Sequence, residues 1–288
     1  MKNQFLLFIF LSCSGLLISE FVFAQHGEER INIYQIASVI TIDGKLDEAT
    51  WKETLWTPVF GDIVTGKAPL YAAKAKMLWD DQNLYIAFVV EDPNIWAFKT
   101  IRDDPMAGHN PGCIIGHKPN EQFQGGWGPF KENFIKIYID PDGDGRNYIE
   151  MHVNPLGKIC DKWQVAPWSQ STRDRLGIPG KGSWLHPADP HPEWNCPGLQ
   201  VGVHTEGSIN DPYDVDDCWT VELAIPFSSI EAVTRHGKAD LAFPPRAGDT
   251  WRMHLGRRYR ASHDAPDVQY WTWPTIGIPS CHEPDRAG

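Results

Sequence analysis

The chain has 288 residues, with 37 acidic and 26 basic side chains and a formal net charge of −11. An acidic surface of this kind argues against nucleic acid or an anionic membrane as a partner. The composition also includes 13 tryptophans, several of them in Gly- and Pro-rich stretches, where an indole either anchors a loop or offers a flat surface to a ligand.

The N-terminus has the layout of a secretory signal peptide. Lys2 precedes a mostly apolar run over residues 5–18, and the sequence Val22-Phe23-Ala24 ends in a small residue suited to cleavage. The apolar run is too short for a membrane-spanning helix, and no later segment is apolar for long enough. We therefore expect cleavage after Ala24, a secreted or periplasmic location, no membrane span, and one mature domain over residues 25–288.

Short alternating segments predict β-strands through the rest of the chain. In residues 84–90 both sets of alternate side chains are apolar, whereas in 219–225 and 251–255 an apolar set alternates with a more polar one. Single helical turns at most are expected, at 47–51 and 228–232. Short antiparallel strands bury their core best as two packed sheets. The predicted fold is all-β, an antiparallel β-sandwich of the jelly-roll or immunoglobulin-like kind, with long Gly/Pro/Trp-rich loops at 101–130 and 164–199.

Residues 134–153 predict a hairpin with two different faces. Alternation puts the aliphatic side chains of 135–139 and 149–153 on one face, the core side. The opposite face carries Phe134, Lys136, Tyr138, Tyr148, Glu150, His152 and Asn154. Rings beside polar groups suit sugar recognition, because a ring stacks on the C–H face of a pyranose and polar groups bind its hydroxyls. An ordinary sheet face with a cross-strand ion pair between Lys136 and Glu150 explains the same residues without a ligand.

The hairpin turn has the sequence DPDGDG. Asp140, Asp142 and Asp144 are spaced like the first ligands of an EF-hand calcium loop, but the twelfth position is Met151 and the flanks are strands. Ordinary turn chemistry accounts for the same Asp, Pro and Gly residues. A structural Ca²⁺ held by the three aspartates and a metal-free turn both stay open, and no cofactor is required.

An odd number of cysteines remains after cleavage. They are Cys113, Cys160, Cys196, Cys218 and Cys281. In an exported protein five cysteines allow at most two disulfides, whose pairing the spacing does not fix, and they are too widely scattered for a zinc motif.

Five stretches resemble family 9 carbohydrate-binding modules, a branch of the DOMON-like β-sandwiches. They are IDGKLDEATW (42–51), AKMLWDDQNLYIA (75–87), ENFIKIYIDPDGD (132–144), WTVELAIPF (219–227) and GDTWRMHLGR (248–257). The resemblance implies an exported, non-catalytic protein that binds a polysaccharide or a reducing-end sugar and acts in carbohydrate catabolism alongside glycoside hydrolases. The relatives continue into a further strand, so truncation of this chain at Gly288 is expected.

The resemblance also implies a set of ligand-binding residues. Two tryptophans clamp the sugar in the family. The first position matches Phe130, with Trp127 nearby, and the second matches Cys281, which cannot stack. The family's charged pair falls on Lys136 and Glu150 with the two charges exchanged. With the rings of the polar face, and with Trp271 and Trp273 as a second stacking surface, the expected ligand-binding residues are Trp127, Phe130, Lys136, Tyr138, Tyr148, Glu150, Trp271 and Trp273.

Two other functions compete with binding. A glycoside hydrolase acting on O-glycosyl bonds needs two carboxylates across the scissile bond, and no motif or aromatic pocket sets such a pair apart. A haem- or metal-binding DOMON-like domain would use His, Met or Lys ligands, for which His109, Cys113, His117, Met151 and His152 are candidates, but a CxxCH attachment site is absent from the sequence. The favoured hypothesis is therefore a binding protein without catalytic residues.

Overall fold

The fold is a sandwich of two β-sheets. The computed structural model describes residues 29–97, 132–167, 169–180, 194–235, 241–261, 268–283 and 286. The strands are β1 (Tyr34–Gln35), β2 (Gly61–Asp62), β3 (Ala73–Trp79), β4 (Asn83–Glu91), β5 (Phe134–Asp140), β6 (Tyr148–Val153), β7 (Ile159–Gln164), β8 (Gln200–Glu206), β9 (Cys218–Pro226), β10 (Arg252–Tyr259) and β11 (Gln269–Trp273). The helices are α1 (Ala49–Glu53), α3 (Gln170–Arg175) and α4 (Phe227–Thr234).

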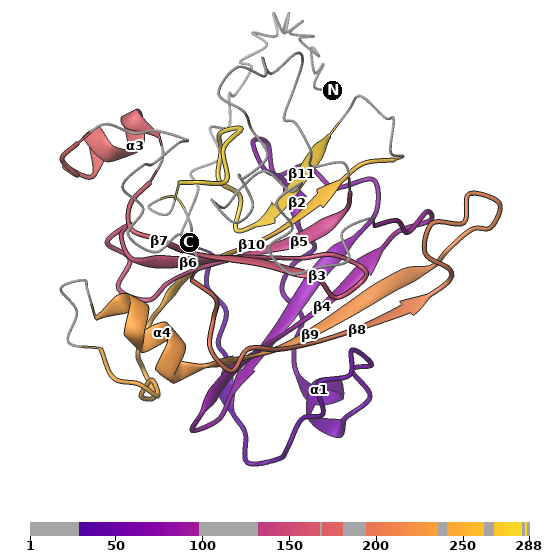
Figure 1. The fold of residues 1–288 in the computed structure, drawn as a ribbon, viewed down its shortest axis with the longest axis horizontal. Helices are drawn as coiled ribbons and strands as arrows, with labels where there is room; N and C mark the ends of the chain where they lie inside the picture. Colours follow the sequence, from indigo (N-terminus) through magenta and orange to yellow (C-terminus); the bar gives the residue numbers. More distant parts are fainter. Residues whose placement is uncertain are drawn as a thin grey trace, which may run out of the picture.

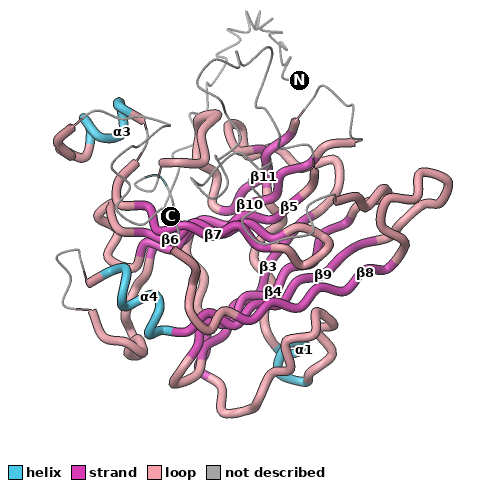
Figure 2. Tube along the Cα trace, viewed as in Figure 1, coloured by secondary structure: helices cyan, strands magenta, loops and turns pink. Residues whose placement is uncertain are grey.

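The two sheets have five and six strands. The first has the order β1-β3-β4-β9-β8, and the second has the order β2-β11-β10-β5-β6-β7. Figures 1 and 2 show them as two layers stacked face to face. All pairs are antiparallel except β1 with β3, whose two-residue pairing is parallel. The predicted β-sandwich is confirmed, with this short parallel pair as the one difference in strand direction among the described strands.

Strand β4 is covered on both faces, as its doubly apolar sequence predicts. The even-numbered residues 84–90 are buried in the core between the sheets. Tyr85 and Ala87 point outward into a second, smaller apolar cluster around Trp51 of α1. Figure 1 shows α1 on the outer side of the five-stranded sheet, and the Trp51 indole donates a 2.7 Å hydrogen bond to buried Glu222 on β9. The helix and the segment before it thus cover part of this face of the sandwich.

The helices are short, and two differ from the expected single turns. α1 matches the turn expected near 47–51 within two residues. α4 is longer than expected because Phe227, Ile230 and Val233 recur at helical spacing and pack against the core. α3 lies within a segment predicted to be loop. None of the helices in the described part of the chain has the length and apolar composition that a bilayer crossing requires.

Candidate functional site

The six-stranded sheet has an aliphatic inner face and a polar outer face. Ile135, Ile137 and Ile139 of β5 lie in the core, as do Ile149, Met151 and Val153 of β6. The predicted division of the hairpin into two faces is therefore confirmed. All residues of β5 and β6 are buried, so the outer side chains of both strands are covered as well. A sheet face of charged and aromatic side chains is thus enclosed, which is unusual unless each polar group is satisfied.

Strand register decides which side chains of the polar face are neighbours. Tyr138 lies opposite Glu150 on β6 and His254 on β10. In the next row, Lys136 lies opposite His152 and Gly256. The third row joins Phe134, Arg258 and Tyr270 across β5, β10 and β11. Lys136 and Glu150 therefore sit diagonally, with Tyr138 rather than Lys136 directly facing the carboxylate.

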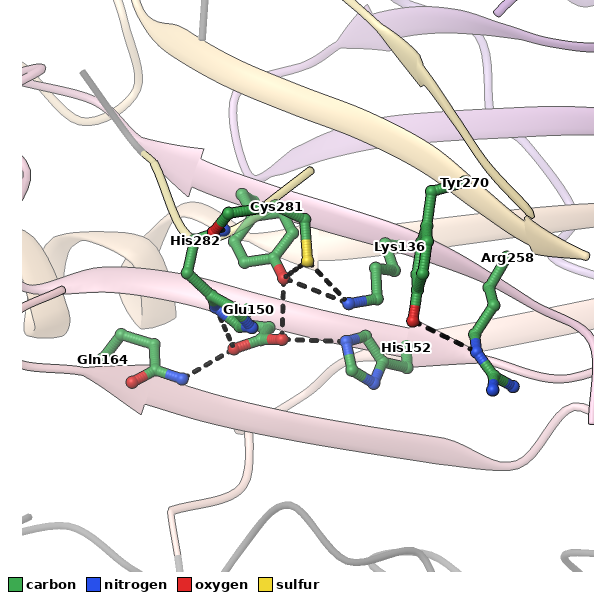
Figure 3. A network of polar contacts seen from close by, with 10 residues as sticks. Lys136, Glu150, His152, Gln164, Arg258, Tyr270, Cys281 and His282 are labelled. Carbon is green, nitrogen blue, oxygen red and sulfur yellow. Dashed lines mark hydrogen bonds and ion pairs between the residues drawn. The ribbon is translucent and has the colours of Figure 1, made fainter. Parts of the chain in front are cut away.

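Four side chains approach the carboxylate of Glu150 on this face (Figure 3). Its Oε1 accepts a 2.8 Å hydrogen bond from Tyr138 Oη and lies 2.9 Å from His152 Nε2. Its Oε2 accepts a 2.6 Å bond from Gln164 Nε2 and lies 3.8 Å from His282 Nδ1. Burial alone raises the pKa of Glu150, but the positive charge of His282 and the contact with His152 reverse this and hold the pKa well below its usual range. The carboxylate is ionised and fully engaged.

Lys136 lies beside a thiol and among aromatic rings. Its Nζ is 3.0 Å from Cys281 Sγ and 3.4 Å from Tyr138 Oη. The ammonium also lies 5.6 Å from the centre of the Tyr270 ring and 5.8 Å from that of Phe134, within the range of cation–π attraction. Burial lowers the pKa of Lys136, but Cys281 and other nearby acidic groups outweigh burial and raise it. Lys136 is therefore a buried cation, 5% exposed.

The C-terminal segment crosses the polar face. His282 packs edge-on against the Tyr138 ring, with ring centres 5.7 Å apart. Glu283 is anchored by Arg175 at 2.7 Å and by the hydroxyl of Thr172, so α3 fixes the end of this segment. Cys281 remains partly exposed. Tyr270 on β11 is partly exposed as well, so an accessible rim lies where Tyr270 and Cys281 meet Lys136.

Three buried polar atoms of neutral side chains on this face have no hydrogen-bond partner among the described residues. They are Tyr148 Oη, His254 Nε2 and Thr272 Oγ1. His254 stacks on Tyr138 with ring centres 5.2 Å apart, and burial together with the charges of Lys136 and His282 lowers its pKa to about 3. The imidazole is therefore neutral at pH 7. Unsatisfied buried polar groups cost about 1–3 kcal/mol each, which makes them candidates for ligand contacts.

The structure corrects the expected role of two tryptophans. Trp271 and Trp273 were expected to offer a stacking surface over Lys136 and Glu150, but both lie in the core between the sheets. Trp271 pairs with Arg257, which in turn lies opposite Ile135, and its ring stacks on Tyr259 at 5.2 Å. Alternation along β11 therefore points both indoles inward. They cannot contact a ligand on the outer face.

Tyr270 is the ring of β11 that does reach the polar face. Its hydroxyl accepts a 3.2 Å hydrogen bond from Arg258 Nε, and its ring lies beside Lys136 (Figure 3). Sequence reasoning also missed Gln164 and His254 as members of the face. The signal for His254 was present, because it alternates with the apolar residues of β10 that pack in the core. Gln164 could not have been placed without knowing that β7 pairs with β6.

Other predicted residues stay untested or are separated by the fold. Trp127, Phe130, His109, Cys113 and His117 lie outside the described residues. Met151 and His152, named as haem-ligand candidates, point to opposite faces, since Met151 is in the core and His152 contacts Glu150. They cannot ligate the same haem iron.

The acidic turn forms a compact carboxylate cluster. Side-chain oxygens of Asp140, Asp142 and Asp144 all lie within 4.8 Å of one another. Asp140 Oδ2 accepts a 2.9 Å bond from the Gly145 amide, whereas its buried Oδ1 has no hydrogen-bond partner among the described residues. Burial, then the neighbouring Asp142 and Asp144, raise the pKa of Asp140 to about 8. An all-oxygen cluster with an unsatisfied buried oxygen fits a hard cation such as Ca²⁺.

Comparison with known proteins supports the fold assignment. Residues 42–109 match the family model described as carbohydrate family 9 binding domain-like. A search of curated protein sequences found no significant match. Among solved structures, a family 9 carbohydrate-binding module from Caldicellulosiruptor kristjanssonii in complex with cellotriose is 14% identical, with a TM-score of 0.50, and the match covers 89% of this chain and 90% of that one.

A second solved structure gives a similar result. A putative carbohydrate-binding protein from Bacteroides uniformis ATCC 8492 is 12% identical, with a TM-score of 0.51, over 89% of this chain and 95% of that one. Both likenesses cover 89% of this chain. Together with the family-model match, they identify a family 9-like carbohydrate-binding domain fold.

Proposed function

We propose that the chain is an exported, non-catalytic carbohydrate-binding protein that recognises a polysaccharide or a reducing-end sugar on the outer face of the six-stranded sheet. It works alongside glycoside hydrolases in carbohydrate catabolism. The contacts would come from Lys136, Tyr138, Tyr148 and His254 on the sheet, with Tyr270 at the rim. The signal-peptide layout of residues 1–24 supports export.

The observation that carries this proposal is the set of unsatisfied polar atoms among aromatic rings. Tyr148 Oη, His254 Nε2 and Thr272 Oγ1 are buried without partners among the described residues. Sugar hydroxyls both donate and accept hydrogen bonds, so they suit a phenol, a neutral imidazole and a threonine hydroxyl alike. The ring of Tyr270 supplies an apolar surface of the kind that stacks on a pyranose.

The exposure of the rim indicates where a sugar would enter. Tyr270 and Cys281 are partly exposed, whereas Tyr138 and Glu150 beneath them are buried. On β11 the centre of the Tyr270 ring lies 5.6 Å from the Lys136 ammonium. A sugar stacked on Tyr270 would therefore place its hydroxyls next to the Lys136 ammonium.

The electrostatics of Glu150 favour binding over hydrolysis. A glycosidase needs a carboxylic acid whose pKa is raised so that it is protonated at the working pH, paired with a second carboxylate. The pKa of Glu150 is instead held low by His282 and His152. Its oxygens are occupied by Tyr138 and Gln164. Glu150 is suited to orienting its neighbours and not to donating a proton.

Isothermal titration calorimetry over a glycan panel tests the proposal. The panel holds glucose, cellotriose, xylo-oligosaccharides and soluble xylan, glucan and pectin. Saturable binding to at least one of them is expected, without release of reducing sugar on prolonged incubation. Absence of binding to every member would overturn the proposal. Release of reducing sugar by the purified chain would show that it is a glycoside hydrolase and not a non-catalytic binding protein.

A further inference from the structure

A cysteine and a lysine form a partly buried contact at the rim of the polar face. Lys136 Nζ lies 3.0 Å from Cys281 Sγ, and Tyr138 Oη lies 3.4 Å from the same sulfur. Figure 3 shows the thiol and the ammonium pointing toward each other from the C-terminal segment and β5. Lys136 is 5% exposed. A buried ammonium is costly unless an anion lies close to it.

The thiol is the group best placed to supply that anion. Glu150 is the nearby carboxylate, but its oxygens are engaged by Tyr138, His152 and Gln164, and no ion pair joins it to Lys136 within hydrogen-bonding range. Ionised Cys281 would give Lys136 a direct counter-charge at 3.0 Å. Burial raises the pKa of the Cys281 thiol, but the charges of Lys136 and His282 outweigh burial and lower it to about 6.

Cys218 lacks such an environment. Cys160, Cys196, Cys218 and Cys281 all carry reduced sulfur. Cys218 is partly exposed like Cys281, yet burial and the negative charges of Asp217 and Glu206 raise its pKa. The chain therefore contains its own reference thiol, similar in exposure and opposite in electrostatic surroundings.

We infer that Cys281, held beside Lys136, is a covalent modification site that reacts as a thiolate with small neutral electrophiles, above all hydrogen peroxide. In this step the Cys281 sulfur attacks one peroxide oxygen, the O–O bond breaks, an S–O bond forms, and the departing hydroxide takes a proton to become water. The sulfur is oxidised to sulfenic acid and the peroxide is reduced. Lys136 stabilises the negative sulfur before the reaction and the oxygen added to it afterwards.

This inference goes beyond sugar binding and does not depend on it. Cys281 is partly exposed and lies on the side of Lys136 away from Tyr270 (Figure 3), so a small solute can approach it from solvent. The titratable and charged groups that face Cys281 are Lys136, Tyr138, Tyr148, Glu150 and His282, with His254 and Tyr270 beside them. Of these groups, the cations Lys136 and His282 lower the pKa of the Cys281 thiol most strongly, which favours the thiolate.

Competitive alkylation with iodoacetamide, read by peptide mapping, is the first test. At pH 6 about half of Cys281 is thiolate, whereas a thiol of pKa 9 is only about 0.1% thiolate. A less basic sulfur is also a weaker nucleophile, which reduces this advantage. We therefore expect Cys281 to be alkylated on the order of 20-fold faster than Cys218. The Cys281 rate should level off above pH 7, whereas the Cys218 rate still rises at pH 9. Equal rates at pH 6, or a Cys281 rate that keeps rising to pH 9, would overturn the inference.

The second test removes the partner charge. Lys136→Met should slow alkylation of Cys281 at pH 6 at least about fivefold and leave Cys218 unchanged, and an unchanged Cys281 rate in folded variant would refute the role of Lys136. If the variant does not fold, the alkylation-rate ratio and the pH profile of the wild type decide.

A third test uses hydrogen peroxide followed by a dimedone probe, which labels sulfenic acid. The probe should label wild type and not Cys281→Ser, and equal labelling of both would exclude Cys281 as the site.

Discussion

Tyr138 and Glu150 lie directly opposite each other on β5 and β6, and the tyrosine hydroxyl donates a 2.8 Å hydrogen bond to the carboxylate. Lys136 and Glu150 do not form the expected direct ion pair. Instead, the Tyr138 hydroxyl contacts both charged groups. The charge of His282, the contact with His152 and the charge of Lys136 lower the pKa of Glu150, so it stays ionised although it is only 3% exposed. The stability of the polar face should depend on this carboxylate.

Glu150→Gln should lower the free energy of unfolding by about 3 kcal/mol, because it leaves buried cations without their counter-charge. Urea denaturation at pH 7 measures the change. Glu206→Gln is the matched control, since Glu206 Oε1 also lies 2.9 Å from a histidine, His204, but its side chain is 62% exposed. The control should change stability by less than about 0.5 kcal/mol. Equal losses in the two variants would contradict the assigned role of Glu150.

His254 should make stability depend on pH. Its pKa is lowered to about 3 by burial and by Lys136 and His282, while the unfolded side chain titrates near its ordinary value. Between these two values the unfolded chain binds the extra proton, so this contribution to stability is present at pH 7 and is lost as the pH falls. One proton corresponds to about 1.4 kcal/mol per pH unit.

His254→Phe keeps a ring against Tyr138 and removes this titration. The slope of unfolding free energy against pH between 4 and 6 should therefore be shallower than in wild type by about 1.4 kcal/mol per pH unit. Denaturant titrations at four pH values measure it. Parallel slopes for the two proteins would show that His254 is protonated in the folded state.

Alternation of side chains along the strands predicted which residues of β5 and β6 face outward, but it did not do so for β11. The outward set of β5 and β6 followed from the sequence because the inward set is purely aliphatic. On β11 both Tyr270 and its neighbour Trp271 are aromatic, so residue type does not show which one faces the core. The register that places Tyr270 beside Arg258 depends on strand pairing and is not encoded locally.

The C-terminal contacts were the least predictable part. Cys281 and His282 reach the polar face from a segment without regular strand pairing, 145 residues along the chain from Lys136. No periodicity connects such a segment to a sheet. The helix α3 that anchors Glu283 was likewise hidden in a stretch predicted to be loop. The position of the C-terminal segment and its contact with α3 both depend on long-range packing, which the local sequence pattern does not encode.

Tyr270→Ala should weaken sugar binding about tenfold, equivalent to about 1.4 kcal/mol, because the ring is the partly exposed aromatic surface of the rim. Calorimetry with the best ligand of the glycan panel measures the change. Tyr213→Ala removes a 95% exposed ring on the loop between β8 and β9 and should leave affinity unchanged. Tyr270→Phe keeps the ring and should fall between wild type and Tyr270→Ala. Unaltered affinity in Tyr270→Ala would move the sugar away from this rim.

Calcium should stabilise the acidic turn. At pH 7 the raised pKa of Asp140 reflects burial and the repulsion from Asp142 and Asp144, and a bound divalent cation would satisfy all three carboxylates. Millimolar CaCl₂ should raise the melting temperature relative to EGTA by several degrees. The gain should be lost in Asp142→Asn, which keeps the turn's hydrogen-bonding shape. The same melting temperature with CaCl₂ and with EGTA would mean that the cluster is a metal-free turn in which Asp140 holds a proton.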